Sequence, residues 1–494
     1  MLTRRALLGG IAGAAAAQRR RRPNLLFLLA DDHAGYVLGA AGDQRAETPN
    51  LDRLAGEGTR FARHHTNSPV CTPSRQSFFT GQMPHMAGVT VLRTPLAEDK
   101  PTLARQLQAA GYATGVIGKM HFNRPSRPGL HGFDWLMTEQ DVQQAWSAGK
   151  PAREVAADIP TKPPWRPFRD PARIWLNAEK LPFPRYYDDM KGSWIARRAV
   201  RYLEEHSNRS FALWVSFHEP HSPFDFPIDD RERYEPGRFP VPRVGAQDAW
   251  QIPLIFRELG EQEKQGIIAA YYTSVWFLDR NVGVVLDALG RLKLDQDTLV
   301  IYMADHGYSL GHHGRFEKHC GYEPALHVPL ILRLAGRIRR GVVREMTEHI
   351  DVPATLVDLL DVDPLPVLHG RSLRPYLEGR RAEARDHIVS EYLENEEAFV
   401  RSARYKLIFG SGRRSRQDGY QTDNPTPGRY VRLFDLEEDP GEFSNVASRR
   451  PQVVAELEGL LLDRFRRTHP EAEREPQRLS REEALEWYVR PRDA

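Results

Sequence analysis

The sequence predicts an α/β protein with a large mixed, mostly parallel sheet sandwiched by helices, followed by a smaller C-terminal α+β subdomain that contains an antiparallel sheet. The first observation is a series of continuous apolar runs, too short for free helices, at residues 24–30, 112–118, 211–217 and 298–304. Such runs are typical of strands buried in a parallel sheet. The second observation is the helical spacing of apolar residues between these runs. The third is a change after about residue 374 to short alternating runs, which are typical of antiparallel strands.

The N-terminus predicts an export signal at residues 1–17. Arg4 and Arg5 precede a short apolar run and an Ala-rich zone, and cleavage is expected after Ala17. The arginine pair followed by leucines resembles a twin-arginine signal, and the alternative is an ordinary secretory signal whose arginines form its positive end. The run is too short to span a membrane. Either signal sends the protein to the periplasm or out of the cell.

The net charge, the length and the cysteine count limit which partners and which sources of stability the protein can have. The 69 basic and 66 acidic residues give a net charge of +3, which does not favour nucleic-acid binding. The 494 residues are enough for a large core and a second domain. The two cysteines, Cys71 and Cys320, give no disulfide framework, so stability must come from packing.

Acidic side chains follow two of the predicted strands. Asp31 and Asp32 come directly after residues 24–30, and Asp305 with His306 follows residues 298–304. Ligands bind at the carboxyl ends of the strands in doubly wound sheets, so these side chains are expected at one edge. Neighbouring carboxylates repel each other, and a bound cation is the usual remedy. A solvated acidic turn is the alternative for Asp31 and Asp32.

Basic side chains follow other strands. Lys119 and His121 come after residues 112–118, and one intervening residue places both on the same side of an extended segment. His221 stands between two prolines after the next strand and is a candidate proton donor. Lys318, in a later loop, is a candidate anion ligand. Surface lysines and a buried histidine are the alternatives.

Cys71 opens the pattern Cys-x-Pro-Ser-Arg, which ends at Arg75. Pro73 suits the first turn of a helix that continues through Phe78 and Phe79. Cys71 is therefore expected at a helix N-terminus, where backbone N–H groups favour an anion. A structural cysteine is the alternative for this short motif.

Together these residues resemble the type I sulfatases of the alkaline-phosphatase superfamily, over residues 24 to about 447. The matching motifs are the Asp31-Asp32 turn, the Cys71 pattern, Gly-Lys-x-His at 118–121, Pro-His-x-Pro at 220–223, Asp305-His306-Gly307, Lys318, and C-terminal landmarks at 370–373, 404–407, 433–436 and 439–440. The resemblance implies an alkaline-phosphatase-like fold and a hydrolase of sulfuric esters.

The resemblance also implies a metal site made of Asp31, Asp32, Asp305 and His306, with the modified Cys71 facing the cation. Ligands rich in carboxylate oxygen favour a hard cation, Ca²⁺ or Mg²⁺. His306 stands where many relatives have Asn, and nitrogen is an unusual ligand for calcium.

In the mechanism that the resemblance implies, a formylglycine-generating enzyme converts Cys71 to an aldehyde whose hydrate is the nucleophile. Arg75 and Lys119 would orient this hydrate. One hydroxyl attacks sulfur, while His221 or Lys318 protonates the leaving oxygen. His121 would then help break the resulting hemiacetal and release sulfate.

The domain prediction has four parts. The signal at 1–17 precedes a catalytic domain at 23–375. A C-terminal subdomain at 376–470 carries strands at 386–393, 398–409 and 430–436 and a helix at 451–467, and residues 471–494 form a charged surface tail. Within the catalytic domain, residues 135–189 are expected to form an elaborated loop that shapes a substrate pocket, with plain packing as the alternative.

The functional prediction is an exported sulfatase that releases inorganic sulfate from a sulfate ester or sulfamate, with a sulfated carbohydrate as the preferred substrate. One alternative is a phosphodiesterase or phosphonate monoester hydrolase of the same superfamily. Sulfate and phosphate are both tetrahedral anions, so Arg, Lys and a cation bind them in similar ways. The set of Lys119, His121, His221 and Lys318 favours sulfate. A catalytically silent carbohydrate-binding homologue is the other alternative. No sequence feature predicts the oligomeric state.

Overall fold

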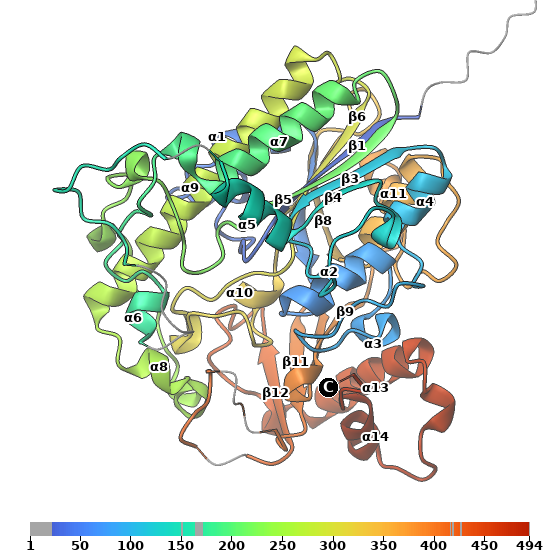
Figure 1. The fold of residues 1–494 in the computed structure, drawn as a ribbon. Helices are drawn as coiled ribbons and strands as arrows, with labels where there is room; N and C mark the ends of the chain where they lie inside the picture. The colour runs from blue at the N-terminus through green and yellow to red at the C-terminus, as the bar shows by residue number, and fades with distance from the viewer. Residues whose placement is uncertain are drawn as a thin grey trace, which may run out of the picture.

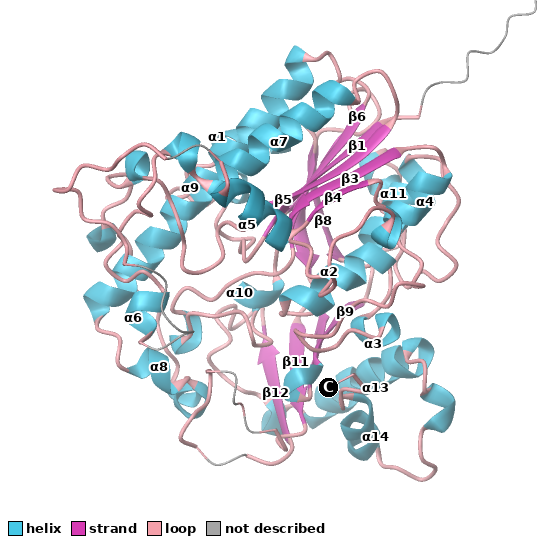
Figure 2. Cartoon of the chain, viewed as in Figure 1, coloured by secondary structure: helices cyan, strands magenta, loops and turns pink. Residues whose placement is uncertain are grey.

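The computed structural model describes residues 22–149, 152–163, 171–414, 416, 419–424 and 427–493, and Figure 1 shows their arrangement. The predicted export signal at residues 1–17 lies outside the described residues. Two separate groups of strands are visible in Figure 2, the larger one flanked by helices and the smaller one beside the C-terminal helices. The predicted fold class is therefore confirmed.

The larger sheet has eight strands in the order β4-β3-β5-β1-β6-β7-β2-β8. Its strands are β1 Asn24–Ala30, β2 Thr59–His65, β3 Ala113–Gly118, β4 Trp135–Met137, β5 Phe211–Ser216, β6 Thr298–Ala304, β7 Leu330–Arg333 and β8 Gly341–Glu348. Only β7 runs antiparallel to its neighbours β6 and β2, and the other pairs are parallel. The carboxyl ends of β3, β5, β1 and β6 consequently meet at one edge.

Strand β1 lies inside the sheet between β5 and β6, and all seven of its residues are buried. Successive side chains of a strand point to opposite faces, so β1 supplies two cores. Phe27 stacks on Phe78 and Trp214 on one face, whereas Leu26 and Leu28 pack into the other. The first core also receives α2 Cys71–Thr80, α4 Leu103–Ala109 and α11 Asp351–Leu359, and the second receives α1 Pro49–Glu57, α7 Lys191–Glu205 and α9 Glu261–Arg291.

The smaller sheet is antiparallel, in the order β12-β11-β10-β9. Its strands are β9 His387–Tyr392, β10 Glu397–Ser402, β11 Tyr405–Gly410 and β12 Tyr430–Asp435. The run expected as one strand at 398–409 is two strands, because the chain reverses between Ser402 and Tyr405. One face of this sheet packs on α13 Pro451–Thr468. The other face contacts Val70 and Tyr322 of the larger part.

Two expectations differ from the structure. Residues 135–189 contain β4, α5 Glu139–Ser147 and α6 Ala172–Trp175, so this stretch is more than a loop. The expected surface tail at 471–494 contains α14 Arg481–Tyr488, whose Leu485 and Tyr488 are fully buried. Tyr488 stacks on Phe465 of α13, and this apolar face was hidden in the sequence among charged residues.

The remaining helices are short. They are α3 Pro84–Ala87, α8 Leu254–Arg257, α10 Glu323–Leu326 and α12 Arg374–Leu377. Among the described residues, none of the helices combines the length and the apolar character that crossing a bilayer requires.

Candidate active site

The predicted site residues meet where the strands of the larger sheet end. Asp31 follows β1 and Asp305 follows β6, and the parallel register pairs Ala30 with Ala304, so the two aspartates lie side by side. The backbone N–H of Asp32 donates to Oδ1 of Asp305 at 3.1 Å. Lys119 follows β3. The edge predicted from the strand ends is therefore assembled from segments far apart in the sequence.

Cys71 is the first residue of α2 and is 2% exposed. Its sulfur lies 3.1 Å from Nε2 of His306, 3.2 Å from Nζ of Lys318, 3.6 Å from Oδ1 of Asp31 and 3.9 Å from Nζ of Lys119. Burial raises the pKa of the Cys71 thiol to about 12, although the two lysines oppose this shift. The side chain is consequently a neutral thiol at physiological pH, and a thiol is a poor nucleophile.

Four side chains form a group that fits a divalent cation. Asp31, Asp32, Cys71 and His306 each offer one ligand atom, and these atoms lie within 4.8 Å of one another. Oδ2 of Asp32 is buried and accepts no hydrogen bond from the described residues. Buried carboxylates next to each other are costly without a compensating positive charge, so this donor set suits a hard cation.

Asp305, the fifth predicted ligand, lies outside this four-residue group. Its Oδ2 accepts a hydrogen bond from Nε of Arg75 at 2.8 Å. Its Oδ1 accepts from the backbone N–H groups of Asp32 and His306 at 3.1 and 2.9 Å. In this structure Asp305 therefore braces the other ligands.

Two lysines balance the paired aspartates. Lys119 forms an ion pair with Oδ2 of Asp31, and Nζ of Lys318 donates to Oδ1 of Asp32 at 2.8 Å. Burial acts to raise the pKa of Asp31, but the positive charges of Lys119, Arg75 and Lys318 outweigh it and hold that pKa well below its usual value. The pKa of Asp32 is raised because burial outweighs Lys318. Burial acts to lower the pKa of both lysines, but Asp31 raises the pKa of Lys119 and Asp32 raises the pKa of Lys318. Both ammonium groups therefore stay charged.

Arg75 lies fully buried beneath the carboxylates. It donates to Asp305 through Nε and to Oγ of Ser216 through Nη1 at 2.9 Å, and its Nη2 lies 3.6 Å from Oδ2 of Asp31. A third contact reaches the backbone oxygen of Lys119. The guanidinium thus ties the ends of β6, β5, β1 and β3 together.

The two histidines predicted to be catalytic, His121 and His221, lie at the rim of the site. Side-chain exposure is 24% for His121 and 17% for His221, against 8% or less for the lysines. Nδ1 of His221 donates to the carbonyl oxygen of Ser222 at 2.6 Å, which leaves Nε2 as the free acceptor 3.9 Å from Oδ2 of Asp32. Burial, with Lys119 nearby, lowers the pKa of both histidines well below the usual value. Both rings are therefore neutral at physiological pH.

Several supporting residues were missed in the sequence. Ser216 ends β5, so the strand-end signal that found Lys119 also marked it. Tyr271 of α9 donates through its hydroxyl to the backbone oxygen of Asp32 at 2.6 Å, and Nε2 of His349 donates to the backbone oxygen of Asp305 at 2.9 Å. No local sequence signal marks these two contacts, because they join segments that only the folded core brings together.

Comparison with known proteins gives consistent matches along the chain. A family model described as Sulfatase matches residues 23–362, and one described as N-sulphoglucosamine sulphohydrolase, C-terminal, matches residues 311–467. The chain is 27% identical to a choline-sulfatase of Rhizobium meliloti, covering 94% of this chain and 90% of the relative. It is 28% identical to an N-acetylglucosamine-6-O-sulfatase of Bacteroides thetaiotaomicron, covering 72% and 71%.

A solved structure shares the fold. The phosphonate monoester hydrolase from Silicibacter pomeroyi superposes with a TM-score of 0.75, covering 91% of this chain and 96% of that chain. The two sequences are 23% identical, so this similarity carries the fold alone.

Proposed function

Because this chain belongs to the sulfatase family and is a sulfuric ester hydrolase, we propose that it is an exported enzyme that removes sulfate from a saccharide, with Cys71 converted to formylglycine beside a divalent cation. The observation that carries the proposal is the position of Cys71. Its sulfur lies within 3.9 Å of two lysines, one aspartate and one histidine, in a site with paired buried carboxylates.

Conversion of Cys71 is supported by the state of the thiol. A buried thiol whose pKa is raised to about 12 is uncharged at neutral pH and cannot act as a thiolate. The hydrated aldehyde of formylglycine supplies an oxygen nucleophile at the same position. The neighbouring Lys119 and Lys318 would stabilise negative charge on that oxygen.

The cation would be held by Asp31, Asp32 and His306, together with the modified residue 71 and with Asp305 at the side. We propose Ca²⁺, with Mg²⁺ as the alternative, because the donor set is rich in carboxylate oxygen. When bound, the cation polarises the sulfate oxygens and favours deprotonation of the hydrate.

The remaining residues bind the anion and move protons. Lys119 and Lys318 would contact the sulfate oxygens, and Arg75 keeps the carboxylates in place from below. The negative charge of a bound sulfate favours protonation of His221 on Nε2, and His221 in that state, or Lys318, would protonate the leaving oxygen. His121, whose Nδ1 lies 3.2 Å from Oγ1 of Thr72, would take a proton from residue 71 as sulfate is released.

Two finer parts of the proposal rest on sequence. The N-acetylglucosamine-6-O-sulfatase among the relatives supports a sulfated saccharide as substrate. The arginine pair and apolar run in residues 1–17 support export through the twin-arginine route, with an ordinary secretory signal as the alternative. A formylglycine-generating enzyme is then the partner needed before export.

The test measures the mass of the peptide that contains Cys71, in protein made together with a formylglycine-generating enzyme. We expect the loss of mass that accompanies conversion of thiol to aldehyde, and hydrolysis of an aryl sulfate that Cys71→Ala abolishes. Cys320, also buried and free, serves as the internal control and stays a thiol in the same digest. An aryl phosphonate monoester is assayed in parallel. Unmodified Cys71 in active protein, or a preference for the phosphonate, would overturn the proposal.

A further inference from the structure

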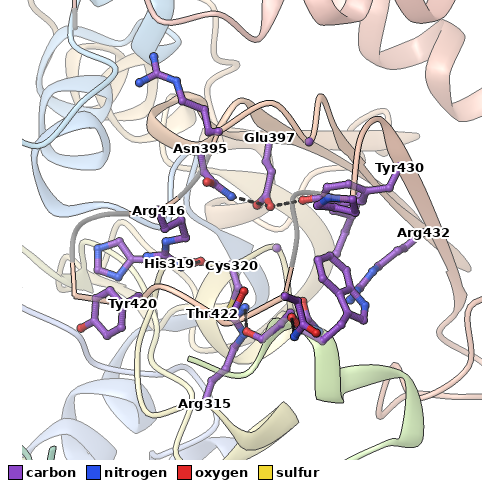
Figure 3. A pocket seen from close by; sticks show the side chains of 18 of the residues that line it. Arg315, His319, Cys320, Asn395, Glu397, Arg416, Tyr420, Thr422, Tyr430 and Arg432 are labelled. Carbon is purple, nitrogen blue, oxygen red and sulfur yellow. Dashed lines mark hydrogen bonds between the residues drawn. The ribbon is translucent and has the colours of Figure 1, made fainter. Parts of the chain in front are cut away.

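A pocket lies between the larger part of the chain and the C-terminal sheet, outside the group of residues around Cys71. It is formed by the segment after β6, by η6 Ala246–Gln251 and by strands β10 to β12, and its cavity volume is about 100 Å³. Figure 3 shows Arg416, His319 and Tyr420 on one side and Tyr430 and Arg432 on the other. That volume has room for one small group of a ligand.

The pocket begins one residue along the chain from the active site. Lys318 reaches Cys71 with its ammonium nitrogen at 3.2 Å, and the next residue, His319, lines the pocket. Covalent geometry therefore limits the distance from Cys71 to the start of this pocket to roughly 10–15 Å. A saccharide of one or two units spans that distance.

The pocket is rich in positive charge. Its lining contains the arginines Arg315, Arg414, Arg416 and Arg432 and a single carboxylate, Glu397. Glu397 accepts hydrogen bonds from Tyr430 and Asn395, and burial raises its pKa. Arg315 and Arg416 form ion pairs with Glu317, and Arg414 forms one with Glu396, so among the described residues the positive charge left for an anion is that of Arg432.

Arg432 is the arginine with spare binding capacity. It is 7% exposed, and its guanidinium donates to the hydroxyl of Tyr322 and lies 4.3 Å from the ring centre of Trp250. Its Nη2 is buried and donates no hydrogen bond to the described residues. No carboxylate of those residues forms an ion pair with Arg432, whereas Arg315 pairs with Glu317. Buried arginines are rarely unpaired, so an anionic acceptor is the expected partner of Nη2.

We propose that this arginine pocket binds a second anionic group of the substrate, a sulfate or a carboxylate on the saccharide that carries the scissile sulfate. The proposal rests on the proposed function and names its substrate class: saccharides with more than one negative charge. Nη2 of Arg432 donates to the second anion, and the aromatic rings of Trp250, Tyr420 and Tyr430 line the same pocket. Arginine suits this task because its planar N–H groups match sulfate and carboxylate oxygens.

The test compares kcat/KM for three saccharides with the same scissile sulfate ester: one with no other charge, one with a second sulfate and one with a carboxylate. We expect at least one of the two dianionic saccharides to be preferred about tenfold or more, and the better one identifies the anion. Arg432→Met should abolish that preference, and Arg432→Lys should keep part of it. The matched control is Arg404→Met, an exposed arginine at the turn of the same small sheet, which should keep the full preference.

Two results would overturn the proposal. One is equal kcat/KM for the charged and uncharged saccharides in the unaltered enzyme. The other is an equal loss on all three saccharides in a folded Arg432→Met variant, with folding checked by thermal unfolding, because that result indicates a structural role. Failure of the proposed function is seen separately, as absence of any sulfatase activity in protein modified at Cys71. The pocket is then tested by calorimetric binding of the dianionic saccharide to Cys71→Ala, with and without Arg432→Met.

Discussion

Nζ of Lys318 lies 3.2 Å from Sγ of Cys71 and donates to Asp32 at 2.8 Å. The lysine comes from the loop after β6, so it joins the proposed nucleophile at position 71 to a predicted metal ligand just after β1. Burial opposes its charge, but Asp32 and Cys71 raise the pKa of Lys318 well above its usual value. A lysine of this kind is a fixed positive charge and a poor proton donor at neutral pH.

This relationship predicts different roles for Lys318 and His221. Lys318→Met should lower kcat about 100-fold or more on aryl and alkyl sulfates alike, because charge stabilisation beside residue 71 does not depend on the leaving group. His221→Gln should cost about 100-fold on alkyl sulfates and little on nitrophenyl sulfate, because only a poor leaving group needs a proton. Steady-state kinetics on a series of leaving groups measures both. The reverse pattern would assign the acid role to Lys318.

The metal site predicts stabilisation by a cation. Added Ca²⁺ or Mg²⁺ should raise the melting temperature, because a ligand that binds only the folded state stabilises it, by about 2.7 kcal/mol at 100 times its dissociation constant. Asp32→Asn should abolish the shift, and a chelator should reverse it in the unaltered protein. Asp287→Asn, at an exposed carboxylate paired with Arg53, is the control that keeps the shift. A shift that survives Asp32→Asn would place the cation elsewhere.

His131 predicts a loss of stability in mild acid. Its ring is fully buried, neither nitrogen has a hydrogen-bond partner among the described residues, and burial with the nearby Arg105 lowers its pKa to about 4. The unfolded chain therefore binds more protons, and stability falls as pH drops from about 6.5 towards 4. The group should contribute about 2 kcal/mol to the loss between pH 7 and 5. Denaturant unfolding of His131→Asn, a residue that tolerates the positive φ of 52° at this position, should show a correspondingly flatter pH dependence. An unchanged slope would exclude His131 as the titrating group.

Helix α14 predicts that the C-terminal region contributes to stability. Leu485 is fully buried in the core that α13 and α14 form with the small sheet. Leu485→Ala should lower the free energy of unfolding by about 2–5 kcal/mol, because it leaves a cavity. Arg490→Ala, at an exposed position just beyond the helix, should change it by about 0.5 kcal/mol or less. Equal effects of the two substitutions would contradict the packing described for α14.

The sequence predicted the central strands well because burial on both faces leaves a continuous apolar run, as in β1 and β6. Prediction from the sequence was weaker where the apolar pattern is short or is interrupted by charged residues. β4 has three residues, the turn between Ser402 and Tyr405 lacks glycine, and the apolar face of α14 is scattered among charges. The strand-end rule correctly predicted that Asp31, Asp32 and Asp305 meet at one edge of the sheet, since it depends only on where strands stop. It could not locate Tyr271 or His349, because their contacts with the site depend on how distant helices and strands pack.

The burial of Cys71 determines whether modification of this residue comes before or after folding. All ten residues of α2 are buried, and the thiol itself is 2% exposed. A modifying enzyme must bind the residues on both sides of the cysteine. In the folded protein these residues are buried and cannot be bound. If Cys71 becomes formylglycine, the change must happen while the segment is still an open strand of nascent chain. Protein that folds before modification then stays inactive. The fraction of active enzyme therefore depends on the rate of modification relative to the rate of folding.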